Sequence, residues 1–156
     1  MRTLLLAVLI GLGLAASAPV AQAQGPGGLY VAGIDFTFAN AVKQGLADNR
    51  KPGRFIVLVV PPATRALLAE GAPPADVQLR KTAAARGGQF VVCRRDVESG
   101  AVLPANLVPG VGVVWGWTKN PNAPQMGPNG LFPDESPAYF PYDANLIRRM
   151  RSICAS

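Results

Sequence analysis

The chain has 156 residues, with 15 lysine and arginine, 9 aspartate and glutamate and no histidine, which gives a formal net charge of +6 at neutral pH. The absence of histidine excludes every Ser-His and Cys-His catalytic pair and removes the commonest metal ligand. The basic excess is modest and contains no Lys/Arg run interleaved with aromatic residues, so nucleic acid is not an expected partner.

The first 23 residues have the pattern of a secretory signal peptide. Arg2 gives a positive start, residues 4–14 form an apolar centre, and residues 21–23 (AQA) form a cleavage site, with ASA at 16–18 as an alternative. The apolar stretch is shorter than the roughly 20 residues that cross a membrane. We therefore expect a periplasmic or secreted protein, without a membrane span after cleavage.

The central part of the chain predicts alternating strands and helices after a flexible leader at 24–28. Apolar runs predict strands at 29–34, 54–60, 89–93 and 111–115. Helical spacing and end signals predict helices at 38–49, 63–70, 76–86, 94–99 and 104–107, with Asp76 as the N-cap of the third. This alternation predicts an α/β fold, a small doubly wound sheet, mostly parallel, with helices on both faces.

The C-terminal part differs in composition. Residues 119–142 hold six prolines, so we expect a proline-rich extension that aromatic side chains attach to the body, namely Tyr139, Phe140 and Tyr142. Asp143 is expected to cap a last helix. The predicted apolar face of this helix is formed by Leu146, Ile147, Met150 and Ile153. The predicted solvated face is formed by Arg148, Arg149 and Arg151. The expected organisation is a signal peptide, the leader, one domain at 29–118 and an extension at 119–156.

Cys93 is the strongest candidate for chemistry. Ligands of a parallel sheet bind at the carboxyl ends of its strands, and Cys93 ends the third predicted strand. Three interpretations remain open. The helix start and Arg94 could favour a reactive thiolate, the cysteine could be an inert core residue, or it could form a disulfide with Cys154. Cys154 could also resolve an oxidised Cys93.

Three further residues lie at predicted strand ends. Asp35 follows the first strand and could orient a substrate or act as a base, although capping the next helix is the favoured interpretation. Trp115 and Trp117 alternate, so they are expected to share one side of the fourth strand. Core packing or an interface is favoured for them over a platform that stacks on a ligand.

Two patterns that would indicate a cofactor or a metal are discounted. The GVG at 110–112 precedes a strand, whereas a dinucleotide-binding turn follows one. The spacing of the two cysteines with Met126 and Met150 does not support a copper site. We therefore expect neither a cofactor nor a bound metal.

Residues 83–93 (AAARGGQFVVC) followed by 107–111 (LVPGV) resemble the DsrE/DsrF-like sulfur-relay family. Members of this family carry a similar phrase of AARG, apolar strand and cysteine, then a crossover and an LLPGV strand entry. The resemblance extends over about residues 29–117. It implies a small doubly wound domain that forms homo-oligomers and carries sulfane sulfur as a persulfide on the strand-end cysteine, here Cys93, for exchange with a donor or acceptor protein.

The chain departs from the family at three places. Pro61-Pro62 stands where relatives have a turn containing histidine or glycine, residues 94–96 are more charged, and the extension replaces the last helix. The leading hypothesis is an exported carrier of sulfane sulfur on Cys93. The alternative is a non-catalytic binding or interaction module of the same fold, in which Cys93 is buried or bonded to Cys154.

Overall fold

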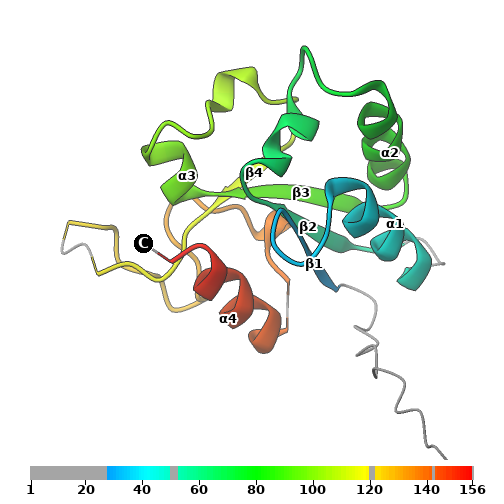
Figure 1. Ribbon diagram of the computed structural model, residues 1–156. Coiled ribbons are helices and arrows are strands. Elements are labelled where there is room, and N and C mark those ends of the chain that lie inside the picture. Colours follow the sequence, from blue (N-terminus) through cyan, green and yellow to red (C-terminus); the bar gives the residue numbers. More distant parts are fainter. Residues whose placement is uncertain (1–27, 50–52, 120–121, 142, 156) are drawn as a thin grey trace, which may run out of the picture.

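A computed structural model describes residues 28–49, 53–119, 122–141 and 143–155 (Figure 1). The predicted signal peptide, most of the predicted leader and Tyr142 lie outside the described residues. The elements in chain order are β1 (Leu29–Ala32), α1 (Phe38–Asp48), β2 (Phe55–Val59), η1 (Ala63–Leu67), α2 (Pro74–Ala85), β3 (Gly88–Cys93), α3 (Arg94–Glu98), η2 (Pro104–Asn106), β4 (Gly112–Val114), η3 (Pro137–Tyr139) and α4 (Ala144–Ile153).

The strands form one parallel sheet in the order β1-β2-β3-β4. The helices α1 and α2 lie on one face of this sheet and α4 lies on the other (Figure 1). The predicted α/β class, with a parallel sheet and helices on both faces, is confirmed. The strand order follows the chain without a reversal, because all three connections between strands pack on the same face. The C-terminal extension covers the second face.

The central strand β2 shows why both faces need a cover. All five of its residues are buried, as expected of an apolar strand inside a parallel sheet. Successive side chains point to opposite faces, so Phe55 and Val57 enter the core under α1 and α2, while Ile56 and Leu58 enter the core under α4. A single cover would leave half of each strand in water.

The helix α1 begins after Thr37 and packs its apolar stripe on the first face. The Thr37 hydroxyl accepts a hydrogen bond from the backbone N–H of Asn40, which satisfies one free donor of the first turn. The prediction that Asp35 caps this helix is therefore wrong. Inside the core, the ring of Phe38 stacks on that of Phe90 with a centroid distance of 5.8 Å.

The helix α2 begins earlier than its sequence pattern predicts. Asp76 lies in the first turn and is not the N-cap, because Pro74 provides the fixed φ angle that suits the first helical position. Arg80, on the same helix, is buried and donates hydrogen bonds to the carbonyl oxygens of Ala66 (2.6 Å) and Leu68 (3.2 Å). Burial lowers the pKa of Arg80, and its contacts attach η1 to α2.

The extension after residue 118 completes the second core, which it shares with the strands of the sheet. The predicted cap of the last helix is confirmed, since the Asp143 carboxylate accepts hydrogen bonds from the backbone N–H groups of Asn145 and Leu146. Phe140 is buried and Tyr139 packs against the same core, as predicted. In the described part of the chain, no helix has the length and apolar character needed to cross a membrane.

Candidate functional site

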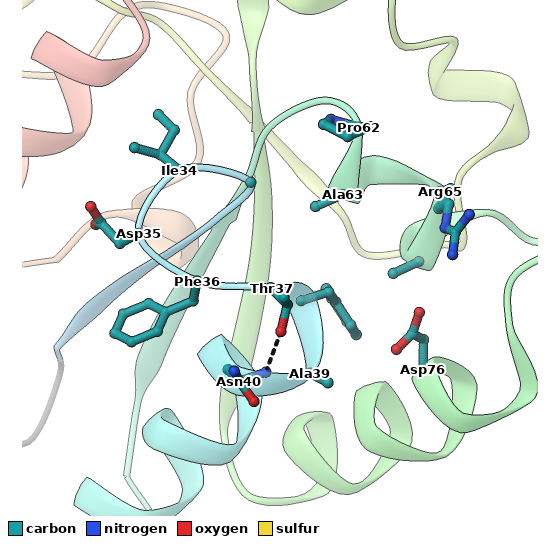
Figure 2. A pocket seen from close by; sticks show the side chains of 13 residues that line it. Ile34, Asp35, Phe36, Thr37, Ala39, Asn40, Pro62, Ala63, Arg65 and Asp76 are labelled. Atoms are coloured by element: carbon teal, nitrogen blue, oxygen red, sulfur yellow. Dashed lines mark hydrogen bonds between the residues drawn. The ribbon is translucent and has the colours of Figure 1, made fainter.

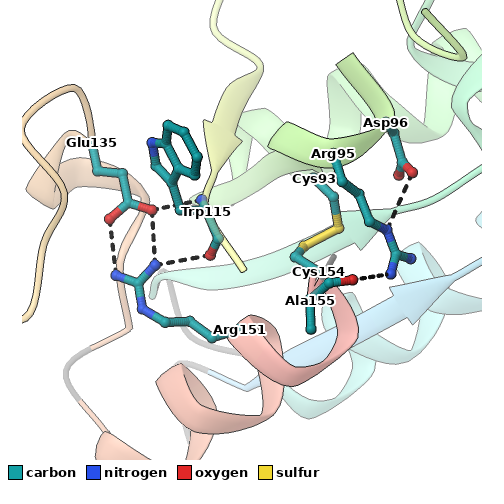
Figure 3. Close-up of a disulfide and its surroundings, with 8 residues drawn as sticks. All are labelled: Cys93, Arg95, Asp96, Trp115, Glu135, Arg151, Cys154 and Ala155. Carbon is teal, nitrogen blue, oxygen red and sulfur yellow. Dashed lines mark hydrogen bonds and ion pairs between the residues drawn. A yellow bond between two sulfur atoms is a disulfide. The ribbon is translucent and has the colours of Figure 1, made fainter. Parts of the chain in front are cut away.

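Cys93, the last residue of β3, is bonded to Cys154, the residue that follows α4 (Figure 3). Their Cα atoms are 5.1 Å apart. Their exposed fractions are 0% and 1%, so neither sulfur is open to solvent. Of the three interpretations of Cys93, the structure supports the disulfide with Cys154. Both cysteines of the chain take part in this bond.

Arg94 begins α3, directly after the disulfide. Its guanidinium forms an ion pair with Asp134 and lies over the ring of Trp115, 4.8 Å from the ring centroid. The indole N–H of Trp115 also donates to Asp134, at 2.7 Å. Two predicted site residues, Arg94 and Trp115, therefore meet, and both contact a carboxylate from the proline-rich segment.

A buried ion pair connects α4 to the same segment (Figure 3). Arg151 and Glu135 are both fully buried side chains, joined by two hydrogen bonds of 3.0 and 2.9 Å. Arg151 also donates to the carbonyl oxygens of Trp115 (2.8 Å) and Gly130 (2.7 Å). The prediction that Arg151 faces solvent is wrong, because Glu135 and these carbonyls compensate its burial.

The chain after β4 runs close to the end of α4. The backbone N–H of Trp117 donates to the carbonyl oxygen of Arg151 at 3.1 Å, and 43% of Trp117 remains exposed. A Cβ atom on Gly116 would lie 1.9 Å from the carbonyl oxygen of Cys154. Only glycine permits this close approach, so Gly116 helps to set where the disulfide can form.

Asp35, in the loop after β1, lies far from the disulfide in sequence but also contacts α4. Its carboxylate accepts a hydrogen bond from Arg149 within an ion pair. Both side chains are partly exposed. The structure thus places Asp35 in a link between the β1 loop and the helix α4.

A cavity of about 710 Å³ opens at the carboxyl ends of β1 and β2 (Figure 2). Its wall is formed by residues 33–40, by the turn and η1 after β2, and by the first turn of α2. Cavities of this size are typical of small-molecule sites, and this edge of a parallel sheet is where ligands bind. Neither cysteine lines the cavity.

The cavity wall carries three charged side chains, Asp35, Arg65 and Asp76, among apolar ones. Arg65 and Asp76 lie on the same side of it (Figure 2). Ile34 and Phe36 line it while 61% and 37% exposed. Arg65 is not among the residues that the sequence singles out, although it comes shortly after a strand end, the signal that pointed to Asp35.

The described residues contain no group of three or more aspartate, glutamate, cysteine or histidine side chains that could hold a metal ion. The fold and the contacts above define a parallel α/β protein with one internal disulfide. Comparisons with models of known families, with curated proteins and with solved structures found no match. The resemblance to the DsrE/DsrF-like family therefore stays a prediction.

Proposed function

We propose that the protein is an exported, non-catalytic binding or interaction module, stabilised by the Cys93–Cys154 disulfide. The observation that carries this proposal is the bond between two buried cysteines. A sulfur in a disulfide has no thiolate, and the thiolate is the species that attacks a sulfane sulfur. The cavity beside β1 and β2 is the proposed ligand site.

The disulfide also supports export. Disulfides persist in the periplasm and outside the cell and are rare in the cytosol. The pattern of residues 1–23 independently predicts a secretory signal peptide. We therefore propose that the protein is periplasmic or secreted.

Alkylation of the purified protein in denaturant tests the proposed function directly. Without reduction we expect no labelled thiol, and after reduction two labelled cysteines. Non-reducing peptide mapping should recover the peptides around Cys93 and Cys154 as one linked species. Labelling of both cysteines in protein that has not been reduced would contradict the proposal.

A persulfide relay of the DsrE/DsrF-like kind is the second candidate, and it requires prior reduction of the disulfide by a thiol reductant. The observation that favours it is a small cavity of about 210 Å³, lined by Cys154 together with Arg94 and Arg95. In the reduced protein, the Cys93 thiolate would attack a polysulfide, and the shortened polysulfide anion would leave. Attack of an acceptor thiolate on the outer sulfur would complete the relay and return the Cys93 thiolate, whereas attack of the Cys154 thiolate on the Cys93 sulfur would reform the disulfide and release hydrosulfide.

Intact mass after polysulfide treatment distinguishes the two candidates. The binding module predicts no sulfur adduct on protein that keeps its disulfide. The relay predicts an adduct on Cys154→Ser, which has a free Cys93 and cannot resolve it, and none on the matched variant Cys93→Ser. The family resemblance also implies a homo-oligomer for the relay, which sedimentation velocity would detect.

A further inference from the structure

We propose that the cavity at the carboxyl ends of β1 and β2 binds a free α-amino acid with an apolar side chain. Arg65 would bind its carboxylate and Asp76 its ammonium group. This inference rests on the proposed binding function and names the class of ligand.

The charges of the cavity match an amino acid head group. Arg65 and Asp76 come from η1 and from the first turn of α2, and both lie on the same side of the cavity (Figure 2). An α-amino acid carries its carboxylate and ammonium on one carbon atom, so it requires two opposite charges close together. A guanidinium can bind a carboxylate through two parallel hydrogen bonds.

These two side chains are available to a ligand. Among the described residues, none forms an ion pair or hydrogen bond with the guanidinium of Arg65 or the carboxylate of Asp76. Asp76 does attract the guanidinium of Arg80 through space, which opposes the effect of burial on the pKa of Arg80. A ligand ammonium would thus join a carboxylate that no hydrogen bond yet holds.

Two other polar side chains of the cavity wall, Asp35 and Thr37, are already engaged. Asp35 pairs with Arg149 of α4, and the Thr37 hydroxyl caps α1. Arg80 donates to two carbonyl oxygens of the segment that contains η1. This leaves Arg65 and Asp76 as the pair of charges that can select a ligand.

The rest of the cavity suits an apolar side chain. Phe38 and Ala66 line it and are 5% and 1% exposed, so they form a rigid apolar wall that continues into the core. Ile34 is largely exposed and Phe36 is partly exposed, and a bound apolar side chain would shield both from water. The combination of an apolar wall with a few placed polar groups is typical of small-molecule sites.

Titrations of the full mature protein, followed by two-dimensional amide NMR, test this inference. The four probes are L-phenylalanine, 2-phenylethylamine without the carboxylate, 3-phenylpropanoate without the ammonium, and the uncharged 3-phenylpropan-1-ol. We expect L-phenylalanine to bind at least about tenfold more tightly than each of the others, because it alone engages both charges. The shifted amides should belong to residues 33–40 and 63–66.

Charge variants assign each contact. Arg65→Gln should weaken L-phenylalanine about tenfold and leave 2-phenylethylamine unchanged, whereas Asp76→Asn should weaken both and leave 3-phenylpropanoate unchanged. Lys81→Gln and Glu70→Gln remove the same charges at exposed positions outside the cavity and should alter neither affinity. Amide dispersion equal to that of the wild type shows that each variant is folded.

Two results would overturn the inference. One is equal affinity for L-phenylalanine and 3-phenylpropan-1-ol, or an affinity that Arg65→Gln does not change. The other is the absence of any shift at the cavity residues with all four probes. Alkylation of the cysteines tests the proposed function independently of these titrations. If the disulfide is intact and the titrations fail, only the proposed class of ligand is rejected.

Discussion

The two faces of the sheet are covered in different ways. On the face under α1 and α2, the helices belong to crossovers whose two ends are both held by neighbouring strands, and the core is mainly apolar. The face under α4 is covered by the C-terminal extension, which follows β4 and is not followed by a further strand among the described residues. There the chain adds a disulfide, a buried ion pair and a close backbone approach at Gly116.

This difference shows that chain connectivity can hold a helix on a sheet where specific contacts would otherwise be needed. A crossover helix returns to the sheet because the next strand requires it, so apolar packing is sufficient to seat it. An extension can leave its face without breaking any strand pairing. The specific contacts of α4 therefore hold it on the sheet, as the crossover connections hold α1 and α2 on the other face. Removing these contacts should destabilise the face under α4 more than the face under α1 and α2.

The largest effect is expected from Arg151→Met. This change removes the only cation paired with the buried Glu135 carboxylate among the described residues, leaving it the backbone N–H groups of Trp115 and Phe132, and it takes a donor from two part-buried carbonyl oxygens. It should lower the free energy of unfolding by about 4 kcal/mol. Urea denaturation measures the loss. The matched variant Arg148→Met, at an exposed position of the same helix, should change it by less than about 0.5 kcal/mol. Equal effects of the two variants would contradict the role given to the buried pair.

The double variant Cys93→Ala/Cys154→Ala should lose about 3–4 kcal/mol of stability. The disulfide closes a loop with a sequence separation of 61 residues, and its loss gives conformational entropy back to the unfolded chain. The slope of the urea transition should also increase, because the unfolded chain without the cross-link exposes more surface. A loss of less than about 1 kcal/mol would show that packing alone seats α4.

Gly116→Ala is expected to cost about 2 kcal/mol, since the new methyl group would collide with the Cys154 carbonyl and push α4 away from β4. Gly127→Ala is the comparison, because its nearest neighbour would be the Asn129 side-chain oxygen at 3.2 Å, which can move. Thermal unfolding of both variants measures the difference. A larger loss of stability in Gly127→Ala than in Gly116→Ala would contradict the role given to the close backbone approach at Gly116.

Tyr30→Phe, on the first face, should have the smallest effect, about 1 kcal/mol. It removes the 2.9 Å hydrogen bond from the Tyr30 hydroxyl to Asp48. Burial, and then that hydrogen bond, raise the pKa of Tyr30 above its ordinary value. The neutral phenol therefore stabilises the fold fully below about pH 10, the unfolded value, and this stabilisation is lost as the pH rises further toward the folded pKa.

The stability difference between wild type and Tyr30→Phe should accordingly stay constant from about pH 7 to pH 9 and shrink above about pH 10. Urea transitions of the two proteins across this range test the sign. A difference that grows with pH in the alkaline range would mean that the fold stabilises the ionised phenol.

The fold could be predicted where the periodicity of apolar residues decides it. The run at 54–60 becomes β2 and the spacing after Phe38 becomes α1, because both patterns report which side chains leave water. The prediction that α2 begins after Asp76 is wrong, because Pro74 offers a competing helix start.

The second face could be predicted less well, because it depends on particular pairs. Arg151 has the spacing of a solvated residue, and nothing near it in the sequence announces Glu135, which comes from a proline-rich segment without periodicity. Cys93 and Cys154 are also far apart in the chain, so their spacing does not distinguish a disulfide from the other two interpretations of Cys93. Arg65 and Asp76 are 11 positions apart in the connection between β2 and β3, and both line the cavity only because the fold of that connection brings η1 and the start of α2 to the same edge of the sheet.

Amide hydrogen exchange with and without a disulfide reductant tests most directly whether specific links hold the second face. We predict that reduction speeds exchange in α4 (Ala144–Ile153), while α1 (Phe38–Asp48) and α2 (Pro74–Ala85) keep their protection. Unchanged exchange in α4, or an equal loss of protection in α1, α2 and α4, would show that the disulfide does not specifically hold α4 on the second face.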